Sequence, residues 1–290
     1  MNVYEVITDR ILESLAKGVV PWRRPWASDA PRSLISGKDY RGVNVFLLQS
    51  SGFTSPHWLT FRQALERKGN VRKGEKGTPV IFWKISEREG ETNANGSPKK
   101  SFILRYSTVF NVAQCDGIIA PPSAARPPFE TIDACERIVE GFAGRPQIHH
   151  GGGRACYSPS EDRIKMPARE AFDSAPEYFS TLFHELTHST GHGSRLDRTG
   201  VTEPIKFGSH SYSFEELIAE CGAAFLCGAS GIAPATLDNS AAYIGNWVSK
   251  LKSDPKWIVQ AAAQAGKAAD LILGRKASGE SAETQESEAA

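Results

Sequence analysis

The chain has 290 residues, of which 40% are hydrophobic and 23% are charged, and its formal net charge at pH 7 is +1. This composition is typical of a soluble globular protein, and the length allows two domains of ordinary size. No apolar run approaches the ~18–20 residues that a membrane-spanning helix needs, so we expect no membrane partner.

The first residues and the cysteines indicate a compartment. Residues 1–9 lack a basic segment followed by an apolar one, so no secretory signal is predicted there. The five cysteines are scattered, odd in number and without a C-x-x-C pair, which favours reduced thiols over a metal cluster or a disulfide framework. The expected location is therefore cytoplasmic.

Charge is divided unevenly along the chain. Residues 1–118 carry 18 Lys and Arg against 11 Asp and Glu, whereas residues 119–290 carry 16 against 22. Such an asymmetry indicates that the two parts have different partners. Four of the six tryptophans also lie in the basic part, which is therefore the candidate for facing nucleic acid.

Near the N-terminus, apolar residues at helical spacing predict an amphipathic helix over Tyr4–Leu15 that ends near Gly18. The following segment, Val20–Trp26, interleaves two tryptophans with two arginines between prolines. A groove for single-stranded DNA uses such groups, because indole rings stack on bases and guanidinium groups neutralise phosphates. A Pro-Trp-rich loop that folds over a core is an equally good interpretation.

The elements that follow predict a small α+β domain. A short buried element is expected within Arg41–Leu48. A helix is expected over Trp58–Arg67, with its apolar side turned inward through Leu59, Phe61 and Leu65.

Two antiparallel strands are expected over Pro79–Ile85 and Phe102–Asn111, joined by a mobile polar loop over Ser86–Lys100. Before them, Asn70–Gly77 is a basic turn, and it is not a phosphate-binding P-loop because it lacks G-K-[ST]. Nucleic-acid binding therefore depends on the combined aromatic and basic clustering. The candidate DNA-binding residues are Trp22, Arg23, Arg24, Trp26, Arg41, Trp58, Arg62, Arg72, Lys73 and Lys76.

Proline-rich residues 120–130 suit neither helix nor sheet and predict a linker. The linker separates a single-stranded-DNA-binding domain at residues 1–119 from a second domain at residues 131–274. Residues 275–290 are small, polar and acidic, and we expect them to form a disordered tail.

The second domain is expected to begin with a helix over Thr131–Phe142 and to continue as a meander of short strands between residues 147 and 167. Two helices, over Asn239–Lys252 and Pro255–Leu273, are expected to end it. The edge of such a sheet can hold an extended peptide by strand addition.

After the strands, His184, Glu185 and His188 form the pattern H-E-x-x-H. Residues four apart lie on the same face of a helix, so the two histidines can bind one zinc ion while Glu185 activates the metal-bound water. An ordinary amphipathic helix with two histidines would show the same five letters. A plausible helix start at Ser174, a stop at Gly191 and an apolar stripe between them favour the metal site.

A catalytic zinc site needs three protein ligands and one open position. His192 does not fit the long metzincin pattern, whose third histidine would stand at Ser194. Glu216 and Glu220 share one face of a helix expected from Ser213 to about Cys227. This resembles the gluzincin arrangement, in which the first acid binds the metal and the acid four residues later supports a ligand histidine.

Glu216 has an alternative role. Ser213-x-x-Glu216 also matches a capping box, in which Glu216 bonds back to the start of the helix and Glu220 becomes the ligand. The sequence favours Glu216 as the third ligand. It leaves Glu220 as a supporting acid or as the alternative ligand.

These ligands predict one zinc ion (Zn2+) of the catalytic type, and another divalent metal would also suit them. Zinc lowers the pKa of its bound water towards ~7, so Glu185 can take the proton and return it to the leaving amine of a peptide. The donor that stabilises the oxyanion stays open among four residues. These are Tyr157, His192, His210 and Tyr212.

Motifs along nearly the whole chain carry a family resemblance. Those of the N-terminal part are Pro21-Trp22, Tyr40-Arg41-Gly42-Val43-Asn44, Trp58-x-Thr60-Phe61-x-Gln63-Ala64, Val71–Gly77 and Val109-Phe110-Asn111. Those of the C-terminal part are Asp162-x-Ile164-x-Met166-Pro167, His184–His192, Arg195-Leu196-x-Arg198 and Glu215-Glu216-Leu217-x-Ala219-Glu220. Together they resemble the ArdC-type antirestriction proteins of conjugative plasmids and other mobile elements.

The resemblance implies a single-stranded-DNA-binding domain followed by a zincin-like metallopeptidase domain, and a role in protecting incoming plasmid DNA from host restriction. An alternative is a DNA-binding protector whose metallopeptidase fold is a non-proteolytic scaffold. In a third interpretation, the basic domain binds a protein. Besides single-stranded DNA, the expected partners are a protein substrate met on DNA or a component of a restriction system.

Overall fold

The computed structural model of the chain describes residues 2–23, 30–53, 55–92, 98–121, 128–203, 210–232 and 241–275. These residues form a mixed fold of helices and strands, as the sequence predicts. The helices are α1 (Val3–Ala16), α2 (Val43–Ser50), α3 (Phe61–Glu66), α4 (Pro128–Gly141), α5 (Ala175–Ser189), α6 (Thr199–Thr202), α7 (His210–Ser230), α8 (Ala241–Ser253) and α9 (Trp257–Ile272). The strands are β1 (Arg32–Ser33), β2 (His57–Thr60), β3 (Asn70–Val71), β4 (Thr78–Thr92), β5 (Pro98–Asn111), β6 (Cys115–Asp116), β7 (Gln147–His150), β8 (Cys156–Ser158) and β9 (Arg163–Met166).

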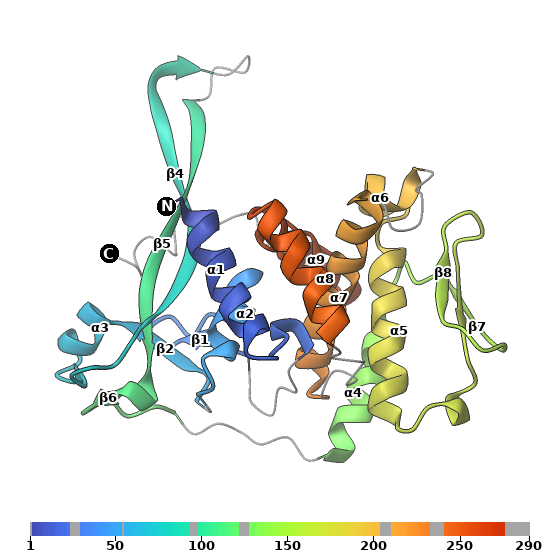
Figure 1. Cartoon of the computed structure of the whole chain (residues 1–290), viewed down its shortest axis with the longest axis horizontal. Coiled ribbons are helices and arrows are strands. Elements are labelled where there is room, and N and C mark those ends of the chain that lie inside the picture. The colour runs from blue at the N-terminus through green and yellow to red at the C-terminus, as the bar shows by residue number, and fades with distance from the viewer. Residues whose placement is uncertain are drawn as a thin grey trace.

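The N-terminal part contains a four-stranded sheet with the order β1-β2-β5-β4. Strands β4 and β5 form a long hairpin that projects away from the helices (Figure 1). The predicted mobile loop over 86–100 is therefore wrong for most of its length, because pairing continues to Glu87 opposite Lys100 and to Thr92 opposite Pro98. A projecting ribbon exposes both faces to water, so its outer half can be as polar as a loop. Residues 93–97 lie outside the described part of the chain.

The helix predicted over Trp58–Arg67 is also partly wrong. Its first residues form β2, and only Phe61–Glu66 are helical, beginning at a capping box in which Thr60 and Gln63 exchange hydrogen bonds. The inward face changes as a result, since Phe61 is 48% exposed and Leu65 is 50% exposed. The capping box, and not the apolar pattern, determines where the helix begins, and it places that start three residues later than predicted.

The N-terminal helices share a core with the last helices of the chain. Buried residues of α1 and α2 pack in one cluster with residues of α7, α8 and α9, and Trp22 lies inside it. Figure 1 shows α1 and α2 lying between the hairpin and these C-terminal helices. The predicted linker at 120–130 lies largely outside the described residues, and its end is already helical because α4 begins at Pro128. The domain boundaries stay a prediction, as does the tail, of which Arg275 alone is described.

A second core surrounds the metal-binding motif. It is formed by α4, α5, α7, α9 and the three-stranded sheet, whose order is β7-β9-β8. The sheet is not the predicted meander, because β9 lies between the other two strands and runs parallel to β7. Glycines 151–153 follow β7, and the chain then crosses to pair β8 on the far side of β9. Within the described residues, every helix is too short or too polar to cross a bilayer.

Candidate metal centre

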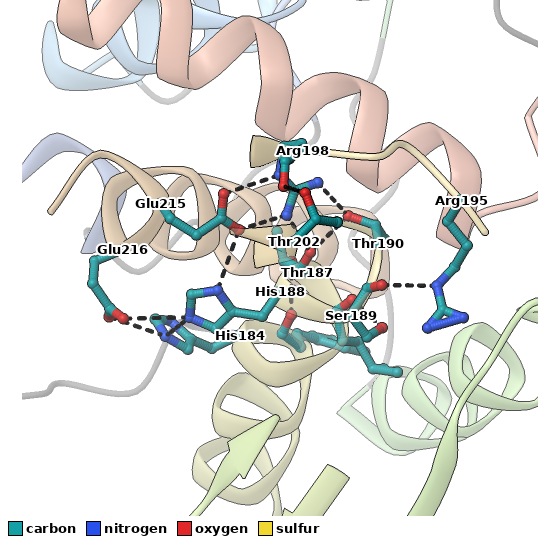
Figure 2. Close-up of polar contacts among 12 residues, drawn as sticks. His184, Thr187, His188, Ser189, Thr190, Arg195, Arg198, Thr202, Glu215 and Glu216 are labelled. Atoms are coloured by element: carbon teal, nitrogen blue, oxygen red, sulfur yellow. Dashed lines mark hydrogen bonds and ion pairs between the residues drawn. The ribbon is translucent and has the colours of Figure 1, made fainter. Parts of the chain in front are cut away.

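Helix α5 carries the H-E-x-x-H motif and begins and ends close to where the sequence predicts. The Ser174 side chain caps its first turn by accepting a hydrogen bond from the backbone N–H of Glu177 at 3.3 Å. The apolar stripe is buried, which fixes the rotation of the helix about its axis. The same stripe leaves His184 and His188 side by side at the end of α5 that faces α7 (Figure 2).

Helix α7 supplies the third side chain. It begins at His210, so Ser213 lies one turn inside it and cannot be the residue that caps it. The Ser213 hydroxyl instead accepts a hydrogen bond from Nζ of Lys250 at 2.6 Å. The capping-box interpretation of Glu216 is therefore wrong, and its carboxylate is available to the histidines.

His184, His188 and Glu216 bring their polar atoms together. The two Nε2 atoms are 3.1 Å apart, and the Glu216 carboxylate lies 3.5 Å from Nε2 of His184 and 3.6 Å from Nε2 of His188. Among the described residues, these three are the group that could hold a metal ion. Glu220 is not a member of this group, so the structure favours Glu216 as the third ligand.

The spacing of these atoms fits a metal ion. Nitrogen and oxygen ligands about 2.1 Å from a tetrahedral zinc ion lie about 3.4 Å from one another. The separations of 3.1, 3.5 and 3.6 Å bracket that value. Two imidazoles and one carboxylate are also the donor types that zinc prefers. The residues therefore fit a divalent metal of this kind.

A glycine contact sets the distance between the two ligand-bearing helices. A Cβ atom on Gly222 of α7 would lie 2.4 Å from Cγ2 and 2.6 Å from Oγ1 of Thr187, which is too close for any side chain. Thr187 is fully buried, and in the sequence of α5 it stands between the two ligand histidines. Glycine at 222 therefore lets α7 come near enough for Glu216 to reach His184 and His188.

Glu215 supports His188 directly, a role that its place in the sequence does not predict. Its Oε1 atom lies 3.3 Å from Nδ1 of His188, the ring nitrogen that does not face His184 (Figure 2). A carboxylate in this place holds a proton on Nδ1 and leaves the lone pair of Nε2 for a metal. The one hint of this role in the sequence is that Glu215 stands directly before Glu216.

Arg198 in turn holds Glu215, and the sequence does not predict this role either. Its Nε and Nη2 atoms donate to the two carboxylate oxygens of Glu215 at 3.0 and 2.6 Å, and both side chains are buried. Arg198 further donates to the Thr190 hydroxyl at 2.7 Å and to the Thr187 carbonyl at 2.9 Å. The segment that carries it lies tightly on Glu215, since a Cβ atom on Gly200 would be 3.0 Å from Oε2 of Glu215.

The electrostatics of the centre favour a cation. Burial alone would lower the pKa of His184, but its hydrogen bond to Glu216 and nearby negative charges raise that pKa to about 9. The charges come from Glu185, Glu220 and Glu216 itself. Burial would raise the pKa of Glu216, but the hydrogen bond to His184 and the charges of both histidines lower it to about 2. These directions indicate that the carboxylates around His184 stabilise positive charge at this place.

Glu185 and Tyr212 lie close enough to the centre to affect it. Glu185 is buried, with 7% of its surface exposed, and its charge acts on both His184 and Tyr212. Burial, followed by the charge of Glu216 and a hydrogen bond to it, raises the pKa of the Tyr212 hydroxyl to about 12. Tyr212 therefore keeps its proton at neutral pH and can donate it in a hydrogen bond.

Two of the other candidate oxyanion donors have different partners. The Tyr157 hydroxyl donates to Asp162 at 2.8 Å, within a group that also includes Arg195. Nδ1 of His192 lies 2.8 Å from the Ser194 hydroxyl. The side chain of His210 lies outside the described residues. Tyr212 is therefore the candidate that the geometry favours.

The predicted DNA-binding residues fall into three groups. Trp22 and Trp58 are 1% and 2% exposed, so the interpretation that they stack on bases is wrong, and the alternative of a loop folded over a core holds for Trp22. Trp22 contacts Phe46 and Trp247 edge to face. The side chains of Arg23, Arg24 and Trp26 lie outside the described residues.

The remaining candidates are exposed cations, most of them in ion pairs. Arg41 pairs with Asp270 of α9, and Arg62 pairs with Glu66 along α3. Arg72 braces the basic turn, since it bonds to Glu75 and to the Ala113 carbonyl. Lys73 and Lys76 of the same turn are exposed. The structure does not gather these residues into one groove with the tryptophans.

Two family models match the chain in succession. The N-terminal domain of anti-restriction factor ArdC matches residues 1–110, and a zincin-like metallopeptidase matches residues 134–264.

DNA primase TraC of Escherichia coli is 38% identical over 93% of this chain, which spans only 27% of that protein. A second TraC primase of the same organism is 35% identical, and the chain spans 20% of it. The uncharacterized protein y4eC of Sinorhizobium fredii is 34% identical over 93% of this chain and 91% of its own length.

Two crystal structures of the antirestriction ArdC protein from the R388 plasmid are similar in fold and sequence. The metal-free structure is 40% identical with a TM-score of 0.74, covering 94% of this chain and 97% of that one. The Mn(II)-bound structure is 39% identical with a TM-score of 0.74, covering 96% and 100%. With this similarity over nearly the full length of a solved relative and both domain types in the same order, the chain belongs to the ArdC-type antirestriction family.

Proposed function

We propose that this chain is an antirestriction protein that binds single-stranded DNA and hydrolyses peptide bonds at a divalent metal held by His184, His188 and Glu216. The observation that carries the catalytic part is the triangle of donor atoms, with edges of 3.1–3.6 Å, beside the buried carboxylate of Glu185. The DNA-binding part is supported by the basic N-terminal residues and by the match of residues 1–110 to the ArdC N-terminal domain.

Zinc is the metal that we propose, because three donors of these types leave one tetrahedral position open. The relative from the R388 plasmid has been crystallised with Mn(II) bound, and Mn(II) is therefore the second metal to test on this chain. When bound, the metal supplies a Lewis acid that polarises the substrate carbonyl and lowers the pKa of water.

The residues of the chain have separate tasks in the proposed reaction. Glu185 accepts a proton from the attacking water and returns it to the leaving amine. Tyr212 donates a hydrogen bond to the oxygen on which negative charge develops. Glu215 and Arg198 hold the ring of His188 in place. An extended peptide would bind along β8, which is an edge strand of its sheet and lies beside α5.

The proposed function is tested by comparing the wild-type chain with Glu185→Gln and His184→Ala. We measure bound zinc, hydrolysis of a fluorogenic peptide library, and protection of incoming plasmid DNA in a restricting host. Glu185→Gln should keep stoichiometric zinc and lose at least about 100-fold in hydrolysis, because the general base is removed. His184→Ala should lose both zinc and hydrolysis. Glu140→Gln, an exposed carboxylate on α4, is the matched control and should behave as the wild type.

Two outcomes would overturn parts of the proposal. Full hydrolysis by Glu185→Gln would show that the site does not act as a peptidase of this type. Full protection by Glu185→Gln, with hydrolysis lost, would show that protection depends on DNA binding and that the metallopeptidase fold acts there as a scaffold. A titration of the wild-type chain with a labelled oligonucleotide tests the DNA-binding part on its own.

A further inference from the structure

The hairpin of β4 and β5 exposes aromatic residues that the core leaves unused. Trp83 is 39% exposed and Tyr106 is 50% exposed, whereas Trp22 and Trp58 are almost fully buried. Both exposed rings lie on the inner half of the hairpin, residues 78–84 and 101–109, which we call the stem; the outer half continues from it and projects from the rest of the molecule (Figure 1). Large exposed rings on a projecting element indicate a binding surface, because they would otherwise be packed against the core.

The strand register places the two rings on one face. Ile81 is opposite Tyr106, and Trp83 is opposite Leu104. Because residues two apart on a strand share a face, Trp83 and Tyr106 are diagonal neighbours on it. Diagonal neighbours have their backbones about 7–8 Å apart, so each ring can receive a base of its own. Ile81 packs against the core at the base of this face.

The same stem is positively charged. Residues 78–84 and 101–109 include Lys84 and Arg105 and contain no Asp or Glu. Arg105 is exposed and lies on the opposite face from the rings, directly across from Phe82. A surface with cations and without carboxylates attracts the phosphates of a nucleic acid. The pairing of rings with cations is the combination that single-stranded nucleic acid uses.

Along most of β5, one edge of the stem has no neighbouring strand among the described residues. Strand β5 pairs with β2 only at Val109–Asn111, so between Ser101 and Thr108 its second edge carries no strand in the described part of the chain. The matching edge of β4 is covered at Ile81, whose backbone N–H and C=O both bond to the Asn44 side chain at 2.8 Å. A ligand that runs along the β5 edge can therefore touch Tyr106 from one face and Arg105 from the other.

We propose that the stem of the β4–β5 hairpin is the surface that binds single-stranded DNA, with bases stacked on Trp83 and Tyr106 and the phosphates along the β5 edge near Arg105. This inference deepens the proposed function and rests on its DNA-binding part. It places the contact on exposed aromatic residues instead of on Trp22 and Trp58, the buried tryptophans among the sequence candidates.

The test is fluorescence anisotropy of a labelled oligo(dT) titrated with the full chain and its variants. Trp83→Ala combined with Tyr106→Ala should weaken binding at least tenfold, because two stacking contacts are lost. Tyr106→Phe keeps the ring and should retain binding within about twofold. Arg105→Gln should lower the slope of log K against log salt by about 0.7. The matched controls are Phe61→Ala, an exposed ring on α3, and Arg137→Gln, an exposed cation on α4.

Three results would overturn the inference. If the wild-type chain binds the oligonucleotide and the double variant binds equally well with an unchanged melting temperature, DNA binds elsewhere. If Phe61→Ala weakens binding as much as the double variant does, the surface lies at α3. If the wild-type chain does not bind the oligonucleotide, the DNA-binding part of the proposed function fails. Protection lost in the double variant would then identify the stem as a protein-binding surface.

Discussion

Arg198 and Glu215 form a two-point ion pair beneath the metal centre, with donor–acceptor distances of 2.6 and 3.0 Å and less than a tenth of either side chain exposed. The Glu215 carboxylate also contacts Nδ1 of His188. The pair therefore connects the segment after α5 to a ligand histidine, and it fixes the orientation of the imidazole ring.

We expect Arg198→Met to weaken zinc binding about 10–100-fold, because Glu215 would no longer be held against His188. The variant should also lose about 3–5 kcal/mol of unfolding free energy, since a buried carboxylate loses its partner. Competition with a chromogenic chelator and denaturant unfolding of the metal-free chain measure the two effects. Arg10→Met removes an exposed ion pair with Glu13 and should cost at most about 1 kcal/mol. Unchanged zinc affinity in Arg198→Met would show that His188 is oriented without the pair.

The contact between Gly222 and Thr187 predicts that Gly222→Ala pushes α7 away from α5. The added methyl group should cost about 1–3 kcal/mol of unfolding free energy and weaken metal binding, because Glu216 moves with its helix. Gly228→Ala is a matched control on the same helix, where a Cβ atom would meet nothing within 4 Å. That change should instead leave stability equal or raise it by about 1 kcal/mol. Thermal unfolding and zinc titration of both variants distinguish helix separation from a general effect of alanine.

The two acids of α7 should differ in their effect on the metal. Glu216→Gln should reduce bound zinc well below one ion per chain, because a neutral amide replaces the ligand carboxylate. Glu220→Gln should keep one ion with weaker affinity, since the charge of Glu220 acts on His184 and its carboxylate is not in the ligand group. Metal analysis after dialysis at fixed free zinc is the measurement. The reverse result would make Glu220 the ligand.

The basic turn should contribute to stability in a way that depends on pH. Hydrogen bonds from Gln114 and then Arg72 lower the pKa of Glu75 below its ordinary value of 4.5. A lowered pKa means that the contribution is present above pH 4.5 and is lost as pH falls through the folded value. Glu75→Gln should therefore lower the melting temperature at pH 7, and the difference from the wild type should shrink as the pH falls below 4.5. A constant difference across this range would contradict the assignment.

Local patterns predicted the part of the site that lies within single helices. The bounds of α5 and the shared face of His184 and His188 follow from a cap, an apolar stripe and a spacing of four residues, and all of these act over one or two turns. Glu216 could be proposed for the same reason. The roles of Glu215 and Arg198 depend on how the segment after α5 folds back onto α7, and no short-range spacing encodes that contact.

The N-terminal part shows why composition is a weaker guide. Tryptophan and arginine near one another are found both in binding grooves and at the edge of a core, and burial decides between the two. Trp22 is surrounded by Phe46 and Trp247, and the latter is more than 200 residues away in the sequence. The outer half of the hairpin was predicted as a loop for a similar reason. An isolated ribbon has no buried face, so it lacks the alternation that normally marks a strand.

Helices α1 and α2 and Trp22 share one core with α7, α8 and α9. This shared core limits where the chain can be divided. Helix α7 carries Glu216 near its start, and Leu217, Ile218 and Cys221 of the same helix pack in the cluster that contains Trp22. A fragment that begins after residue 121 would leave these apolar side chains facing water, with the N-terminal cover removed. Cutting or exchanging the chain at the proline-rich segment would therefore damage the metal-binding half. Recombination between relatives should preserve the two halves as a matched pair.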